Sequence, residues 1–182
     1  MSGTRSNSRE KILTAAAEVA RESGPGNLSL DAVAARAGVS KGGLLYNFPN
    51  KAKLMQSLVE SYVAELERAL DLAVAEGESL SVAFVRHSAA ASDEDQAPAS
   101  WIFSAIAEDP EFLSPVTENR QRLLARLKRG TSDVAGVLVI FLAMEGLLSM
   151  KLFNSEILSQ QDRVVLFDRM LSMAAGLPAA DA

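Results

Sequence analysis

Two short helical segments separated by a tight turn constrain the fold of this chain more than any other feature. Residues 30–37 carry apolar side chains at helical spacing, with Ser29 placed to cap the N-terminus of the helix and Gly38 placed just past its C-terminus. After the turn, Ser40 can cap a second helix over residues 41–47. Two short helices joined by a glycine-containing turn predict a helix-turn-helix unit.

The rest of the sequence favours an all-α fold. Strand alternation is nearly absent, while apolar residues recur at helical spacing in almost every segment. We expect a first helix from near Ser8 to the break at residues 23–27, and a long helix over residues 51–75. The second part of the chain should contain helices near 80–91, 94–108, 111–129, 133–153 and 160–175. The final residues, GLPAADA, are expected to form a frayed tail.

Composition narrows the class of protein. The chain has 182 residues, about half of them apolar, which suits one domain or two small domains that share a helix. It has no cysteine and one histidine, so disulfides and thiolate or histidine-cluster metal sites are excluded, and we expect no metal or cofactor. No catalytic triad, phosphate-binding loop or dinucleotide fingerprint is present, which argues against an enzyme. The first residues lack a secretory signal and the longest apolar run, 134–144, is too short to cross a bilayer, so we expect a cytoplasmic protein.

Charge is divided unevenly along the chain. Residues 1–53 carry 8 basic and 4 acidic side chains, whereas the remainder carries 10 basic and 19 acidic ones. A basic end on an acidic body is typical of a chain that meets phosphate at that end, although random surface variation also produces such a division.

The start of the second short helix is unusual for a helix that only has to be stable. Gly42 and Gly43 are destabilising by roughly 1 kcal/mol each relative to alanine in a helix interior. In a helix-turn-helix the N-terminal residues of this helix lie at the base edges of the major groove, so we interpret the glycines as leaving room for DNA. Ser40 can bind phosphate as well as cap the helix, while Leu44 and Phe48 are expected in the core.

Polar side chains on and after this helix suit DNA. Lys41 can reach phosphate or a guanine edge, and Tyr46 and Asn47 can contact phosphate or bases. Lys51, in the first turn of the next helix, is unfavourable for the helix dipole and favourable for phosphate.

Residues 28–59, LSLDAVAARAGVSKGGLLYNFPNKAKLMQSLV, resemble the tetracycline-repressor (TetR-type) family of transcriptional regulators. The resemblance implies a DNA-binding domain over 8–52, with a connecting helix that continues to about 75, and a C-terminal domain over 53–178 that binds a small effector and dimerises. Most members are repressors that leave their DNA operator when the effector binds. Carried over by position, the implied DNA contacts are Ser29, Ser40, Lys41, Gly42, Gly43, Leu45, Tyr46, Asn47 and Lys51. Many members have a phosphate-binding tyrosine where this chain has Leu45, and here the tyrosine is residue 46.

The segment 133–153 is apolar nearly all round, which a helix tolerates only when it is covered on most sides. Pairing with the segment 160–175 and with the same two helices of a second subunit would cover it. A homodimer with twofold symmetry also suits a palindromic operator. The alternative is a core helix buried within one chain.

An effector pocket is expected among the helices from 80 to 150. The candidates supply apolar walls and a few polar groups, and each could instead be ordinary core. They are Phe84, His87, Trp101, Phe103, Phe141, Met144, Glu145 and Leu148. A charge within an apolar helix needs a partner, so Glu145 should meet an arginine (Arg86, Arg120 or Arg122) or a ligand group. These side chains favour a mainly hydrophobic effector.

The main hypothesis is therefore a homodimeric regulator that binds double-stranded DNA and releases it when a small molecule binds. The alternative is a dimeric small-molecule-binding or interaction module whose helix-turn-helix no longer binds DNA. Lys41, Tyr46 and Lys51, all present where phosphate would lie, argue against this alternative.

Overall fold

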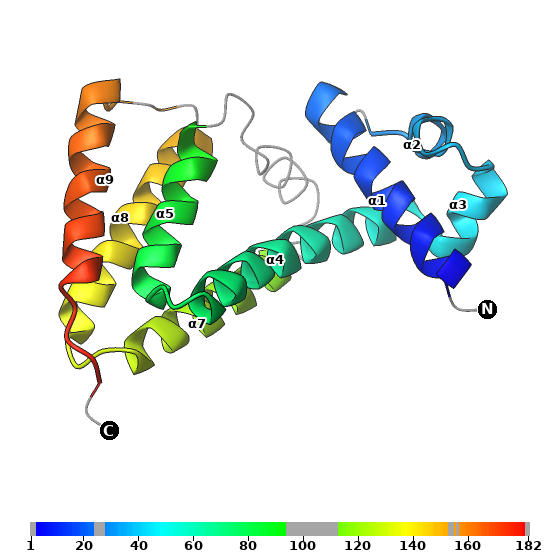
Figure 1. The fold of residues 1–182 in the computed structure, drawn as a ribbon. Coiled ribbons are helices and arrows are strands. Elements are labelled where there is room, and N and C mark those ends of the chain that lie inside the picture. Colours follow the sequence, from blue (N-terminus) through cyan, green and yellow to red (C-terminus); the bar gives the residue numbers. More distant parts are fainter. Residues whose placement is uncertain (1–2, 24–27, 94–112, 153–154, 156, 181–182) are drawn as a thin grey trace. The chain divides into compact units, whose positions relative to one another are not determined.

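The computed structural model describes residues 3–23, 28–93, 113–152, 155 and 157–180, and within them it contains helices and no β-strand. The all-α prediction is confirmed. In chain order the helices in Figure 1 are α1 (Gly3–Ser23), α2 (Leu30–Ala37), α3 (Lys41–Asn47), α4 (Lys51–Ala75), α5 (Leu80–Asp93), α7 (Leu113–Arg129), α8 (Val134–Leu152) and α9 (Gln160–Ala175).

Most predicted helix bounds agree with the structure, and α2, α3, α4 and α9 agree at both ends. Helix α1 begins at Gly3 instead of near Ser8. Within α1, the Arg9 guanidinium lies 5.3 Å from the centre of the Phe48 ring and donates a hydrogen bond to Ser57 Oγ at 3.1 Å. The helix predicted over 94–108 lies outside the described residues.

The N-terminal compact unit comprises Met1–Ala64 with Pro98–Thr117. Its core is built from the apolar stripes of α1, α2, α3 and the first half of α4. The predicted core side chains Leu44 and Phe48 are both buried. They fix the face of α3 that turns inward and therefore the face that turns to solvent.

The second compact unit comprises Glu65–Ala97 and Glu118–Ala182. Helices α5, α8 and α9 run side by side in it (Figure 1) and share one hydrophobic core. Ion pairs link α7 to the C-terminal part of α4, from Arg122 to Glu67 at 3.1 Å and from Arg126 to Asp71 at 2.5 Å. The apolar segment of α8 belongs to this core, and none of the described helices is long and apolar enough to cross a bilayer.

The end of the described chain does not fray as predicted. The hydroxyl of Thr131 is buried in the turn before α8 and donates a hydrogen bond to the carbonyl of Pro178 at 2.5 Å. Thr131 and Ala179 also form an isolated antiparallel bridge. The prediction of a tail missed this contact because the two segments are far apart in sequence.

Candidate nucleic-acid interface

Helix α3 presents two distinct faces, because its caps and its core contacts hold it in one orientation. The Ser40 side chain accepts a hydrogen bond from the amide of Gly43 at 3.1 Å, so the helix begins where the sequence predicts. Leu44 points into the core, whereas Leu45 and Tyr46 keep 37% and 69% of their surface exposed. With Lys41 and Gly42, which are also exposed, they form an outward face that runs along α3.

The turn before α3 is set by Gly38. This residue adopts a left-handed backbone with φ of 65°, which glycine reaches without strain. The amides of Gly38 and Val39 then donate to the carbonyls of Ala35 and Ala34 and close the end of α2. The angle between α2 and α3 therefore follows from a local signal in the sequence.

The two glycines of α3 stand in different surroundings. A Cβ atom added to Gly43 would lie 3.3 Å from Ser40 Oγ, so crowding at the cap already favours glycine there. A Cβ atom added to Gly42 would meet nothing nearer than Ser40 Oγ at 4.0 Å. Nothing in the described fold requires glycine at position 42, which agrees with a need for space outside the protein.

Several of the predicted contact residues already have partners within the chain. The ammonium of Lys41 lies 3.0 Å from the carboxylate of Asp31, at the start of α2. The side-chain amide of Asn47 is partly buried and donates to the carbonyl of Gly43 at 2.9 Å. The side chain of Ser29 caps α2 by accepting a hydrogen bond from the amide of Ala32 at 3.1 Å.

Lys51 occupies the first position of α4 and is partly buried. The side chain of Asn50 accepts a hydrogen bond from the amide of Lys53 at 2.8 Å and so caps this helix. Only residues 48–50 therefore separate Lys51 from the end of α3 at Asn47.

A second cation of this unit is neutralised within the fold. Arg36 donates to the carboxylates of Glu22 at 2.7 Å and Glu18 at 3.3 Å and joins α2 to α1. The hydrogen bond from Arg36 lowers the pKa of the Glu22 carboxyl. All three side chains are exposed, so the cluster fixes helix orientation more than it adds stability.

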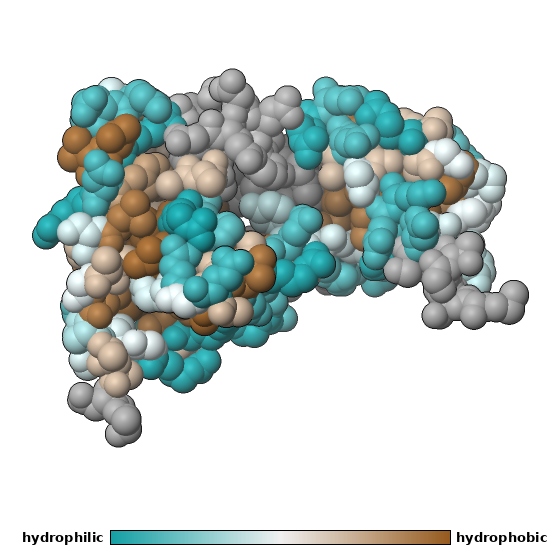
Figure 2. Space-filling model, viewed as in Figure 1, coloured by the Kyte–Doolittle hydropathy of each residue, from teal (hydrophilic) through white to brown (hydrophobic). Residues whose placement is uncertain are grey.

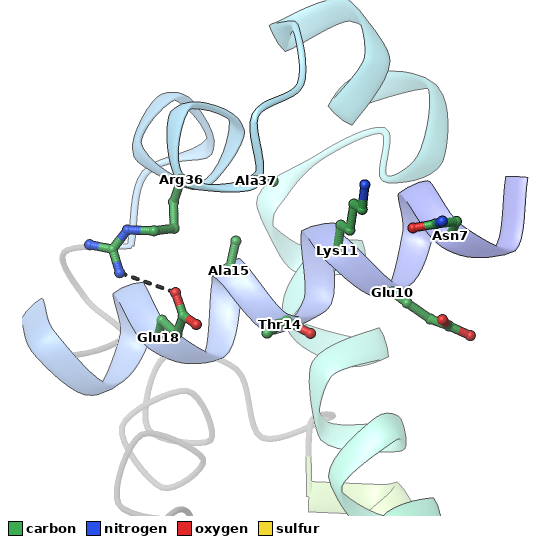
Figure 3. A pocket seen from close by; sticks show the side chains of 8 residues that line it. All are labelled: Asn7, Glu10, Lys11, Thr14, Ala15, Glu18, Arg36 and Ala37. Carbon is green, nitrogen blue, oxygen red and sulfur yellow. Dashed lines mark hydrogen bonds and ion pairs between the residues drawn. The ribbon is translucent and has the colours of Figure 1, made fainter. Parts of the chain in front are cut away.

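An open depression lies beside this cluster, between α1 and α2 (Figure 3). Its lining mixes acidic, basic and neutral side chains, and the bond between Arg36 and Glu18 crosses it. The lining residues are Asn7, Glu10, Lys11, Thr14, Ala15, Glu18, Arg36 and Ala37. None of the predicted DNA contacts belongs to it.

The second unit brings together part of the predicted effector set. The rings of Phe84 and Phe141 stack with centroids 5.7 Å apart, and Met144 is buried in the same core. His87 and Leu148 are half-buried. The other two aromatic candidates, Trp101 and Phe103, lie outside the described residues.

Glu145 has the partner that its position in α8 requires. Its carboxylate accepts a hydrogen bond from Arg120 of α7 at 2.8 Å, and about a quarter of each side chain is exposed. The other two arginines considered, Arg86 and Arg122, pair with Glu78 and Glu67. Burial raises the pKa of the Glu145 carboxyl, and Arg120 only partly opposes this effect.

Sequence reasoning missed Asn119. Its Oδ1 atom is buried and has no hydrogen-bond partner among the residues that the structure describes, and the residue as a whole is 5% exposed. Asn119 lies on the same face of α7 as the buried Leu123 and Leu127. The sequence could therefore have indicated it as a polar residue within an apolar stripe. An unsatisfied buried acceptor costs about 1–3 kcal/mol, which suggests that something other than stability retains it.

Apolar side chains also reach the surface of the second unit, as Figure 2 shows along α9 and beside α5. On α8 and α9 the exposed large apolar residues are Val134, Leu138, Val139, Leu142, Val164 and Val165. Leu142 and Val165 keep 66% and 59% of their surface exposed, whereas Phe167 is buried. A single chain therefore leaves apolar faces of both helices uncovered.

Comparisons with known proteins agree with this architecture. A family model described as "Bacterial regulatory proteins, tetR family" matches residues 12–58, and one described as "Tetracyclin repressor-like, C-terminal domain" matches residues 78–175. A search of curated proteins finds no match.

Solved structures at low sequence identity share the fold. A regulator assigned to the TetR family from Mesorhizobium loti is 16% identical, with a TM-score of 0.70 over 94% of this chain and 95% of that one. A transcriptional regulator from Streptomyces coelicolor is 18% identical, with a TM-score of 0.68 over 92% and 98%. The multidrug-binding protein EbrR, solved with malachite green, is 20% identical, with a TM-score of 0.68 over 94% and 98%.

The C-terminal family model alone covers more than half of the chain, and the two models together account for both compact units. Members of this family are transcriptional regulators and not enzymes, and they bind DNA, dimerise and bind small ligands. The chain belongs to the TetR family of DNA-binding transcriptional regulators.

Proposed function

We propose that the protein is a repressor that binds a palindromic operator as a homodimer and leaves it when a small, mainly hydrophobic effector binds. In this proposal residues 8–52 form the DNA-binding domain and residues 53–178 bind the effector and dimerise. One observation carries it: Lys41, Gly42, Leu45 and Tyr46 are exposed on one face of a capped helix whose other face is locked into the core.

In the proposed complex α3 enters the major groove with its N-terminus foremost. Ser29, Ser40 and Lys51 bind backbone phosphates, because each stands in the first turn or at the cap of a helix. Lys41 reaches the sugar-phosphate edge of the groove, Leu45 and Tyr46 face the bases, and Gly42 and Gly43 allow close approach. Asn47 contacts DNA only if it gives up its hydrogen bond to Gly43.

The proposed dimer forms through α8 and α9. The uncovered apolar side chains of these helices, led by Leu142 and Val165, support this surface. Two copies would bury each other as four helices and place two α3 helices for two operator half-sites.

The proposed effector site lies in the second unit, beside the stacked Phe84 and Phe141. Phe84, Phe141 and Met144 would supply apolar contacts, and His87, Glu145 and Leu148 would border them. EbrR, which shares the fold, has been solved with malachite green and with proflavin, which supports a small-molecule ligand.

The experiment is selection of genomic fragments by the purified protein, followed by a binding titration on the recovered fragment. We expect sequence-specific binding at low salt and release on addition of an apolar small molecule that also raises the melting temperature. A protein that binds no fragment specifically, with or without ligands that stabilise it, would instead favour the interaction module.

A further inference from the structure

We propose that Asp31 competes with DNA for Lys41 and thereby limits the affinity of the protein for every DNA sequence. The proposal rests on the proposed function, because it requires that Lys41 meets DNA. It assigns a role to a residue that lies outside the predicted set of contacts.

The pair bridges the two helices of the helix-turn-helix. Asp31 lies in the first turn of α2, and Lys41 is the first residue of α3. The ammonium lies 3.0 Å from the carboxylate, within range of a charge-assisted hydrogen bond. The side chains of Asp31 and Lys41 are 70% and 59% exposed, respectively, so a molecule that docks on α3 can reach both of them.

Docking on DNA would require Lys41 to exchange one anion for another. A phosphate oxygen offers the ammonium the same kind of partner as the Asp31 carboxylate does. Binding therefore breaks an existing ion pair, so the gain from the phosphate contact is reduced. The freed carboxylate also remains close to DNA, two residues after the proposed phosphate contact Ser29, where it repels the backbone.

Both effects are independent of base sequence, since they act on phosphate. They weaken binding to non-operator DNA and to the operator alike, and leave discrimination to the contacts with base edges. The ratio of operator affinity to non-operator affinity is therefore unchanged, and the ion pair sets only the absolute affinity of the protein for DNA.

A purely structural role for Asp31 makes a different prediction. An acidic residue in the first turn favours the helix dipole of α2. If Asp31 served only this purpose, its replacement would lower the melting temperature and leave DNA affinity unchanged or reduced.

The test uses the full chain with the substitution Asp31→Asn. Affinity is measured against KCl concentration on two probes, the fragment recovered by genomic selection and a duplex of mixed sequence. We expect affinity for both probes to rise roughly 2- to 30-fold, the range given by one exposed ion pair in each of two subunits. The slope of log K against log[KCl] should change by less than about 0.9 per subunit, because Lys41 binds phosphate in both proteins and no phosphate contact is added.

Two controls separate this mechanism from a general change of charge. Glu60→Gln removes the same charge from α4 of the same unit and should leave affinity and slope near the wild-type values. In a Lys41→Gln background, Asp31→Asn should give a smaller gain, because the competition for Lys41 is absent and only the repulsion between the Asp31 carboxylate and DNA remains.

Wild-type affinity in Asp31→Asn would overturn the proposal, as would a full gain in the Lys41→Gln background. Absence of any sequence preference in the wild-type protein would instead refute the proposed function, and the two failures are therefore distinguishable.

Discussion

The substitution Gly42→Ala separates the contribution of α3 to stability from its proposed contact with DNA. In the free protein the new methyl group would lie 4.0 Å from Ser40 Oγ and would meet no closer atom. Alanine is favoured over glycine by about 0.8–1.0 kcal/mol in a helix interior, and by less near a helix end. For a chain of this length we expect the melting temperature to rise by up to about 2–4 °C.

The same methyl group should weaken DNA binding if α3 lies against the bases. An extra carbon in a close-packed contact typically costs about 1–3 kcal/mol, and a dimer would carry two. The expected loss is therefore about 2–6 kcal/mol, or roughly 30-fold or more in affinity. Differential scanning fluorimetry measures the first effect, and fluorescence anisotropy with the selected fragment measures the second.

Gly43→Ala is the matched control. Its methyl group would lie 3.3 Å from Ser40 Oγ, so the capping hydroxyl must move and the gain in helix propensity is offset by a weaker cap of similar size, about 1 kcal/mol. We expect no rise in melting temperature for this variant. A Gly42→Ala protein that is more stable and binds the fragment as tightly as wild type would refute the close approach of DNA to α3 at this position.

Three further predictions concern phosphate contact, assembly and pH. Lys51→Ala should weaken binding to all DNA sequences and reduce the salt slope by about 1 per subunit, as measured by titrations in KCl; an unchanged slope would remove Lys51 from the contacts. Leu142→Arg should give a monomer with poor operator affinity in analytical ultracentrifugation and anisotropy, whereas Leu72→Arg, at a leucine of similar exposure on α4, should remain a dimer. Because burial raises the pKa of Glu145, the folded state binds this proton more tightly than the unfolded state does, so stability is lost as pH rises through the folded pKa. Urea unfolding of wild type should show this decline, and Glu145→Gln should show less of it; equal pH dependence would contradict the assignment.

Local signals account for the parts of the fold that sequence predicted well. Ser29, Gly38 and Ser40 each act within four residues of their own position, and they set the ends of α2 and α3 where expected. The contacts of Arg9 with Ser57 and Phe48 could not be found in this way, because these residues are distant from it in sequence.

The same distinction applies to the candidate site. Residue type indicated that Lys41 could bind phosphate, but its pairing with Asp31 depends on the angle between α2 and α3. Spacing alone placed Glu145 in an apolar helix, where its charge requires a partner. That this partner is Arg120 depends on how α7 packs. Asn119 was visible as a polar residue in an apolar stripe, whereas its lack of a hydrogen-bond partner is a property of the folded state.

Hydroxyl-radical footprinting of the protein on a fragment from its own genome tests the central claim most directly. A homodimer that reads DNA through two α3 helices predicts two equivalent protected regions, related by twofold symmetry and centred about 10 base pairs, or a multiple of this, apart. A single asymmetric region, or no protection at low salt, would contradict it.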